Sequence, residues 1–169
     1  MPMVFAALFI SLVTSFAHIR STQPALRAAI ETGVTHSELF RELVDRLDAS
    51  DVVVHVVYDY DPAPGIAGHL TFAASTGGVR YLRIAIVPRL GGSDLIAILG
   101  HELQHAVEIA DEPSVVDQVS MAAFYATVGE RRSGDRCPTF DTAAAVAAGD
   151  RIRREALGGG RVDGPDRRP

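Results

Sequence analysis

The sequence predicts an α+β fold, and three observations lead to this class. A helical pattern runs through residues 21–49, three segments rich in β-branched and aromatic residues lie within residues 51–88, and three helical segments lie within residues 93–157. Consecutive strands with short connections, preceded and followed by helices, predict a small three-stranded antiparallel or mixed sheet packed against helices. With 169 residues, 47% apolar and 22% charged, the chain has the size and composition of one domain.

The first helical region contains the stretch "THSELFRELVDRLDAS". Thr35 and Glu38 have the spacing of a capping box and predict a helix start. His36 lies at this start, and we interpret it as a solvated or capping residue. The apolar stripe that would face the core consists of Leu39, Phe40, Leu43, Val44 and Leu47.

The strand region comprises "DVVVHVVYDY", "GHLTFAAS" and "GGVRYLRIAIVP", at residues 51–60, 68–75 and 77–88. The turn cluster "DPAPG", a Gly-Gly pair and a proline bound these segments, which is typical of short strands. His55 and His69 lie in or beside the strands. We interpret both as hydrogen-bonded surface or cross-strand residues rather than metal ligands.

Capping residues predict where the three later helices begin and end. Ser93 is the expected N-cap of "SDLIAILGHELQHAVEIA", and "PSVVDQVSMAAFYATVG" is expected to begin near Pro113 and to stop at Gly129. Thr139 is the expected cap of "TFDTAAAVAAGDRIRREAL". Residues 158–169 lack the apolar content needed for a packed core and predict a disordered tail, which leaves residues 18–157 as the single domain.

The N-terminal stretch "MPMVFAALFISLVTSFAHIR" predicts a signal peptide over residues 1–17. Its apolar run has the length of a signal core and ends in the small residues Ser15 and Ala17. A buried helix is the alternative, because no Lys or Arg precedes the run. The signal interpretation predicts a secreted or periplasmic protein with no stable membrane span after cleavage.

Composition excludes several classes of site. The net charge is −5, Trp is absent and no basic stripe is present, so we do not expect nucleic acid as a partner. Cys137 is the only cysteine, which excludes a disulfide within the chain and a cysteine-rich zinc site. We interpret Cys137 as a structural or incidental thiol. Any metal must therefore be held by His, Asp or Glu.

The stretch "GHELQHAVEIAD" has the residue types of a zinc hydrolase site. A helix turns about 100° per residue, which places His101 and His105 about 40° apart on one face, where both imidazoles can reach one metal ion. Glu102 lies beside them and can address a metal-bound water as general base. The motif also occurs by chance, but buried histidines and a glutamate within an apolar helix are costly unless something satisfies them. A metal would do so.

A third protein ligand has three candidates. We favour Asp141 in "CPTFDTAAA", because a carboxylate at the start of a later helix would come from a separate element. Asp111 has the spacing of a metzincin ligand, but Glu108 stands where those proteases need a helix-breaking glycine. Glu108 lies one turn beyond His105 and is better placed to support that histidine or to face solvent.

The stretches "LGHELQHAVEIADEPSV" and "FDTAAAVAAGDRI" resemble those of small exported bacterial proteins with a zincin-like core of the gluzincin type, and the resemblance covers residues 37–157. It implies a sheet packed on the helix with the His-Glu-x-x-His motif and one zinc ion per chain. His101 and His105 would be ligands, Glu102 the general base and Asp141 the last ligand, although gluzincins usually use Glu there.

The same resemblance implies a strand at the rim of the cleft, where an extended substrate could pair. We expect "RYLRIAIVP" (80–88) in this place, because it directly precedes the motif helix. Tyr125 is a candidate to stabilise an oxyanion, although a core tyrosine with a hydrogen-bonded tip is the competing interpretation.

Three functions remain open at this point. The first is a zinc-dependent metallopeptidase that acts on a peptide or protein substrate. The second is a zincin-fold protein with a structural metal and little or no catalysis, acting as a binding or interaction domain. The third is a metal-free helical interaction protein.

Overall fold

The computed structural model describes residues 17–132 and 139–158. Within these ranges the predicted α+β class is confirmed, with five helices and a four-stranded mixed sheet in place of the predicted three strands. The helices are α1 (Pro24–His36), α2 (Glu38–Asp48), α3 (Gly92–Ala110), α4 (Gln118–Val128) and α5 (Ala143–Gly158). The strands are β1 (Ile19–Arg20), β2 (Val52–Tyr58), β3 (Gly68–Thr76), β4 (Val79–Ile86), β5 (Glu130–Arg132) and β6 (Thr139–Asp141).

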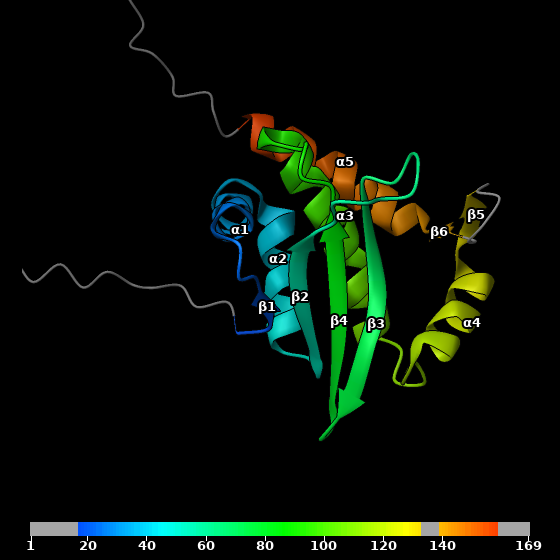
Figure 1. Cartoon of the computed structure of the whole chain (residues 1–169). Coiled ribbons are helices and arrows are strands. Elements are labelled where there is room, and N and C mark those ends of the chain that lie inside the picture. Colours follow the sequence, from blue (N-terminus) through cyan, green and yellow to red (C-terminus); the bar gives the residue numbers. More distant parts are fainter. Residues whose placement is uncertain (1–16, 133–138, 159–169) are drawn as a thin grey trace, which may run out of the picture.

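The main sheet has the strand order β1-β2-β4-β3 (Figure 1). Strands β1, β2 and β4 are parallel, and β3 is antiparallel to β4. The strand missed from the sequence is β1, whose two residues are too few to show a periodic pattern. The expectation that residues 80–88 form the rim strand is wrong, because β4 pairs on both sides and β3 is the edge.

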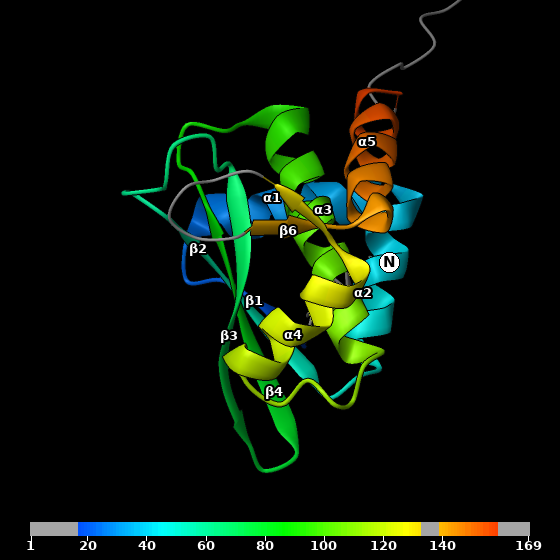
Figure 2. The same cartoon turned by 90° about the vertical axis from the view of Figure 1, so that its right-hand side faces the viewer.

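One face of the sheet carries the core. Alternate residues of β2 and β4 are fully buried, as the pleat requires, and pack against the apolar faces of α2 and α3. Figure 2 shows the helices gathered on one side of the sheet, with α4 beside β3. The buried residues at the centre are Val52, Val54, Val56, Leu82, Ile84, Ile86, Phe40, Leu43, Leu47, Leu99 and Leu103.

The predicted capping box at Thr35 and Glu38 is wrong. Ser37 separates α1 from α2 and is the N-cap of α2, where its hydroxyl accepts a hydrogen bond from the Phe40 N–H at 3.0 Å. The Thr35 hydroxyl instead donates to the Glu31 carbonyl within α1. The predicted helix start is therefore displaced by two residues from the observed N-cap, Ser37.

The later helix starts also differ from their predicted positions. Helix α3 has Gly91 rather than Ser93 as its N-cap, and α4 begins at Gln118 with a capping box of Asp117 and Ser120 rather than near Pro113. Thr139 belongs to β6, which pairs with β5, so α5 begins only after it. The N-cap hydroxyl of α5 is that of Thr142, which accepts a hydrogen bond from the Ala145 N–H.

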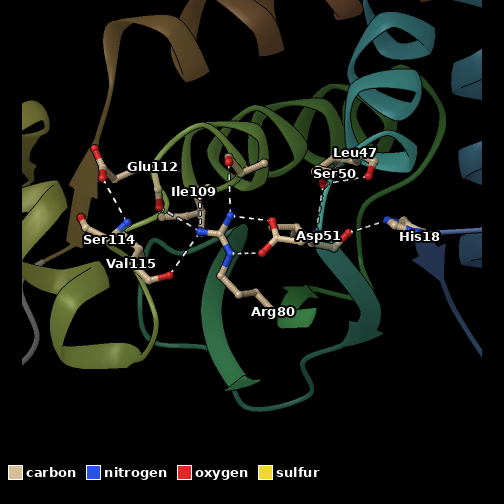
Figure 3. A network of polar contacts seen from close by, with 11 residues as sticks. His18, Leu47, Ser50, Asp51, Arg80, Ile109, Glu112, Ser114 and Val115 are labelled. Carbon is tan, nitrogen blue, oxygen red and sulfur yellow. Dashed lines mark hydrogen bonds and ion pairs between the residues drawn. The ribbon is translucent and has the colours of Figure 1, made fainter. Parts of the chain in front are cut away.

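Arg80 of β4 holds the C-terminal end of α3 against the sheet (Figure 3). Its buried guanidinium donates to the backbone carbonyls of Ile109, Ala110, Glu112 and Val115. It also makes a two-pronged ion pair with Asp51, at 2.8 and 2.7 Å. A cation at this position satisfies carbonyls that a helix end leaves unpaired and complements the helix dipole.

The predicted signal peptide and tail fall almost entirely on residues 1–16 and 159–169, which lie outside the described residues. Helix α5 itself extends to Gly158. Among the helices of the described ranges, none combines the length and apolar content that a membrane crossing requires.

Candidate metal centre

Helix α3 presents His101 and His105 one turn apart, with ring centroids separated by 4.9 Å. Both imidazoles face Asp141, the last residue of β6. The Asp141 Oδ1 atom lies 3.2 Å from His101 Nε2 and 3.7 Å from His105 Nε2. Each of the three residues offers a ligand atom within 4.8 Å of the other two.

These three donors fit a metal ion. In a tetrahedral zinc site with bonds of about 2.0–2.2 Å, ligand atoms lie about 3.3–3.6 Å apart, close to the distances from Asp141 to the two histidines. His101, His105 and Asp141 could therefore hold one metal ion. Two imidazoles and one carboxylate leave a fourth position of the tetrahedron for water or substrate.

Two glycines let α5 lie close to α3 behind the histidines. A Cβ atom on Gly149 would lie 3.3 Å from both the Ala97 carbonyl oxygen and the His101 Cβ, and a Cβ on Gly100 would lie 2.2 Å from Ile152 Cδ1. This approach places the start of α5, and therefore Asp141 just before it, over the motif face of α3. Sequence reasoning missed both residues, although a glycine within an Ala-rich helix is a signal of close packing.

Glu108 orients His105. The His105 Nδ1 lies 2.9 Å from Glu108 Oε2, so Nδ1–H donates to the carboxylate and Nε2 faces Asp141. The Thr142 hydroxyl donates to the other oxygen of Glu108, Oε1, at 2.6 Å. Glu108 thus supports His105 and also binds the residue next to Asp141. The role of Thr142 was missed from the sequence.

The remaining candidate ligand, Asp111, is not brought to the cluster. It is the C-cap residue of α3, its side chain is 64% exposed, and it pairs with Arg46 of α2 at 2.6 Å. The other predicted histidines also lie apart from the three-residue cluster. His55 contacts the Tyr81 ring, His69 lies 3.9 Å from Asp59, and His36 is in the last turn of α1.

Burial dominates the electrostatics of the centre. Burial raises the pKa of Glu102 to about 7, an effect that the charge of His105 opposes and that of Asp141 reinforces. Burial acts to lower the pKa of His105, but the nearby Asp141 carboxylate and the hydrogen bond to Glu108 outweigh it and raise the pKa to about 9. Burial acts to raise the pKa of Glu108, but the hydrogen bonds from His105 and Thr142 hold it below its usual range.

Tyr125 of α4 packs its ring edge-on against His105, with centroids 5.2 Å apart. Burial raises the pKa of its hydroxyl, which stays neutral and donates to the His105 backbone carbonyl at 3.0 Å. The one proton of this hydroxyl is therefore used inside the protein. The arrangement is that of a core tyrosine with a hydrogen-bonded tip, which also fixes α4 to α3.

The cluster and Glu102 line a cleft of about 670 Å³ between β3, α3, α4 and α5. Gly68 of β3 lies against Glu102, since a Cβ atom there would be 3.1 Å from Glu102 Oε1. Sequence reasoning missed this glycine too, although a glycine inside a strand can mark a close approach. The larger apolar side chains of the cleft wall are Leu70, Ile98, Met121, Phe140 and Val146.

No family model, curated protein or solved structure matches this chain. What the chain can do chemically follows from the residues of the cleft and their geometry.

Proposed function

We propose that this chain is a small zinc-dependent metallopeptidase with a zincin-like fold. His101, His105 and Asp141 hold one zinc ion, and Glu102 is the general base. The observation that carries the proposal is that the three possible metal ligands lie in one cleft with Glu102, a buried carboxylate that is not one of them. We also propose that the protein is exported to the periplasm or the medium, because residues 1–17 resemble a signal peptide.

Glu102 has the properties of a general base. When bound, zinc at such a site lowers the pKa of a water molecule and polarises a substrate carbonyl. The Glu102 carboxylate is buried beside the three donors without being one of them, so it is placed to accept a proton from a water molecule held there. Glu102 accepts the proton of the attacking water at its carboxylate oxygen and passes it to the leaving amine.

The third donor agrees with the gluzincin type in coming from an element separate from the motif helix. Asp141 is, however, the last residue of strand β6 and does not open a helix, as was predicted from the sequence. Aspartate is one methylene shorter than the glutamate usual in gluzincins. The close approach of α5 to α3 at Gly149 compensates for the shorter side chain.

The edge strand supports a peptide or protein substrate. Strand β3 is the open edge of the sheet, runs antiparallel to β4 and lines the cleft beside Glu102. An extended peptide can pair with such an edge through its backbone. We therefore assign substrate pairing to β3. The sequence had led us to expect it at β4.

Glu102→Gln tests the proposal. We expect the variant to keep its zinc and to hydrolyse peptides about 10²–10⁴-fold more slowly, because the amide cannot accept the proton. Cleavage of an unstructured peptide mixture is measured by mass spectrometry. Glu31→Gln, at an exposed position of α1, is the matched control. Undiminished hydrolysis would exclude Glu102 as the base. A zinc-loaded parent that cleaves no peptide would favour a structural metal in a binding domain.

A further inference from the structure

The register of β3 shows which of its backbone groups face the cleft edge. On β4, Arg80 N–H and Ile86 C=O bond toward the β2 side, to Asp51 and Asp59. The even-numbered residues of β4 therefore direct their backbone groups to β2. Their partners on β3 are Gly68, Leu70 and Phe72, so these three direct their N–H and C=O groups away from β4.

This open edge is short because a turn precedes it and the Gln118 side chain occupies it at the other end. In the turn before Gly68, the Ile66 N–H bonds to the Ala63 carbonyl. At the other end, the Phe72 N–H donates to the side-chain Oε1 of Gln118 at 2.9 Å. A β-bulge between Phe72 and Ala74 then breaks the regular register.

Gln118 is exposed, and its backbone position is set by helix α4. It is the first residue of α4, directly after the N-cap Asp117, which forms a capping box with Ser120. One turn further along, Met121 is buried, and Tyr125 bonds to the His105 carbonyl. The carboxamide therefore closes the edge from a helix that is anchored to the motif helix itself.

Gly68 and Leu70 are the edge residues that remain open beside the centre. Within the described residues, neither has a hydrogen-bond partner on its outer side. Gly68 faces α3 and Glu102, and the pleat places Leu70 on the same face. A strand that pairs with these two residues passes directly in front of Glu102.

We propose that Gln118 is a specificity-determining residue that limits the paired substrate segment to three residues, those opposite Gly68 through Leu70. The substrate class is then a short extended segment of an unstructured peptide, recognised locally, rather than a long strand. This inference rests on the proposed peptidase function. The apolar wall formed by Leu70, Ile98 and Met121 favours apolar side chains in that segment.

The test combines a peptide length series with hydrogen exchange. One peptide cleaved by the zinc-loaded parent is shortened and lengthened residue by residue at each end, and kcat/KM is measured for the parent, Gln118→Ala and Gln118→Glu. The glutamate variant retains an acceptor for Phe72 N–H and is the matched control. Amide hydrogen exchange at Phe72 reports on the closure independently of activity.

We expect kcat/KM of the parent and of Gln118→Glu to stop rising once the three paired residues are present. In Gln118→Ala the Phe72 amide exchanges faster, and residues added at one end raise kcat/KM by about three- to tenfold, the effect of about one hydrogen bond. A parent whose kcat/KM rises tenfold with residues beyond that segment would overturn the inference. The inference would also be overturned if kcat/KM depended on peptide length in the same way for Gln118→Ala and Gln118→Glu while the Phe72 amide exchanged faster only in Gln118→Ala. Failure of the proposed function looks different, because no peptide of any length is then cleaved.

Discussion

At the scale of single residues, the centre depends on groups that a short motif does not contain. The motif predicts His101, Glu102 and His105 from spacing alone, because a helix fixes which residues share a face. The support of His105 by Glu108 also follows from helical spacing. The hydrogen bond from Thr142 to Glu108 does not, because it joins residues 34 positions apart through a tertiary contact.

Glu108→Gln tests this supporting role. The amide loses the charge that orients His105 and makes its ring nitrogen more basic, so we expect zinc affinity to fall about 10–100-fold with the fold retained. Competition with a zinc chelator measures the affinity. Glu112→Gln, beyond the end of the same helix, is the control and should bind zinc like the parent. Equal affinities for both variants and the parent would exclude Glu108 from the support of the site.

At the scale of elements, the position of α3 depends on its C-terminal anchor on the sheet. Arg80 supplies donors to four carbonyls at and just beyond the helix end and pairs with Asp51. The sequence shows Arg80 only as a charged residue in a strand. Its burial could not be predicted, because the groups that satisfy it come from residues about 30 positions away on both sides.

Arg80→Met removes this anchor while keeping an unbranched apolar side chain. We expect the free energy of unfolding to fall by about 3 kcal/mol, because several buried carbonyls lose their donor. Urea unfolding followed by circular dichroism measures the change. Arg83→Met, three residues along the same strand and exposed, should cost less than about 0.5 kcal/mol. Equal losses for both variants would contradict the anchoring role.

The Asp51–Arg80 pair predicts a dependence of stability on pH. The hydrogen bond from Arg80 is the largest cause that lowers the pKa of Asp51 below its usual value, although burial opposes it. The pKa of Asp51 in the folded protein lies below its value of about 3.9 in the unfolded chain. The pair therefore makes its full contribution to the free energy of unfolding above about pH 3.9, and this contribution is lost as the pH falls further. Unfolding of the parent and Asp51→Asn from pH 7 to pH 3 should show the parent more stable at pH 7 and the difference shrinking below about pH 4. A difference that grows toward acid would contradict this assignment.

At the scale of the whole molecule, local patterns predicted the elements better than their arrangement. The helices and long strands follow from periodicity, and the α+β class follows from their order. The identity of the edge strand does not, because β4 pairs in parallel with β2 and leaves the intervening β3 outside. The proximity of Asp141 to the histidines depends on how closely α5 packs on α3. Gly100 and Gly149 permit this close packing, but a glycine in the local sequence does not show which helix will lie against it.

Zinc binding by His101, His105 and Asp141 is the property on which the proposed function depends most directly. Elemental analysis after dialysis against buffered zinc at neutral pH is the decisive measurement, made on the parent, His101→Ala/His105→Ala, Asp141→Ala and Asp111→Ala. We predict about one zinc ion per chain in the parent and in Asp111→Ala, and almost none in the other two variants. A parent without zinc, or a loss in Asp111→Ala with retention in Asp141→Ala, would contradict the account.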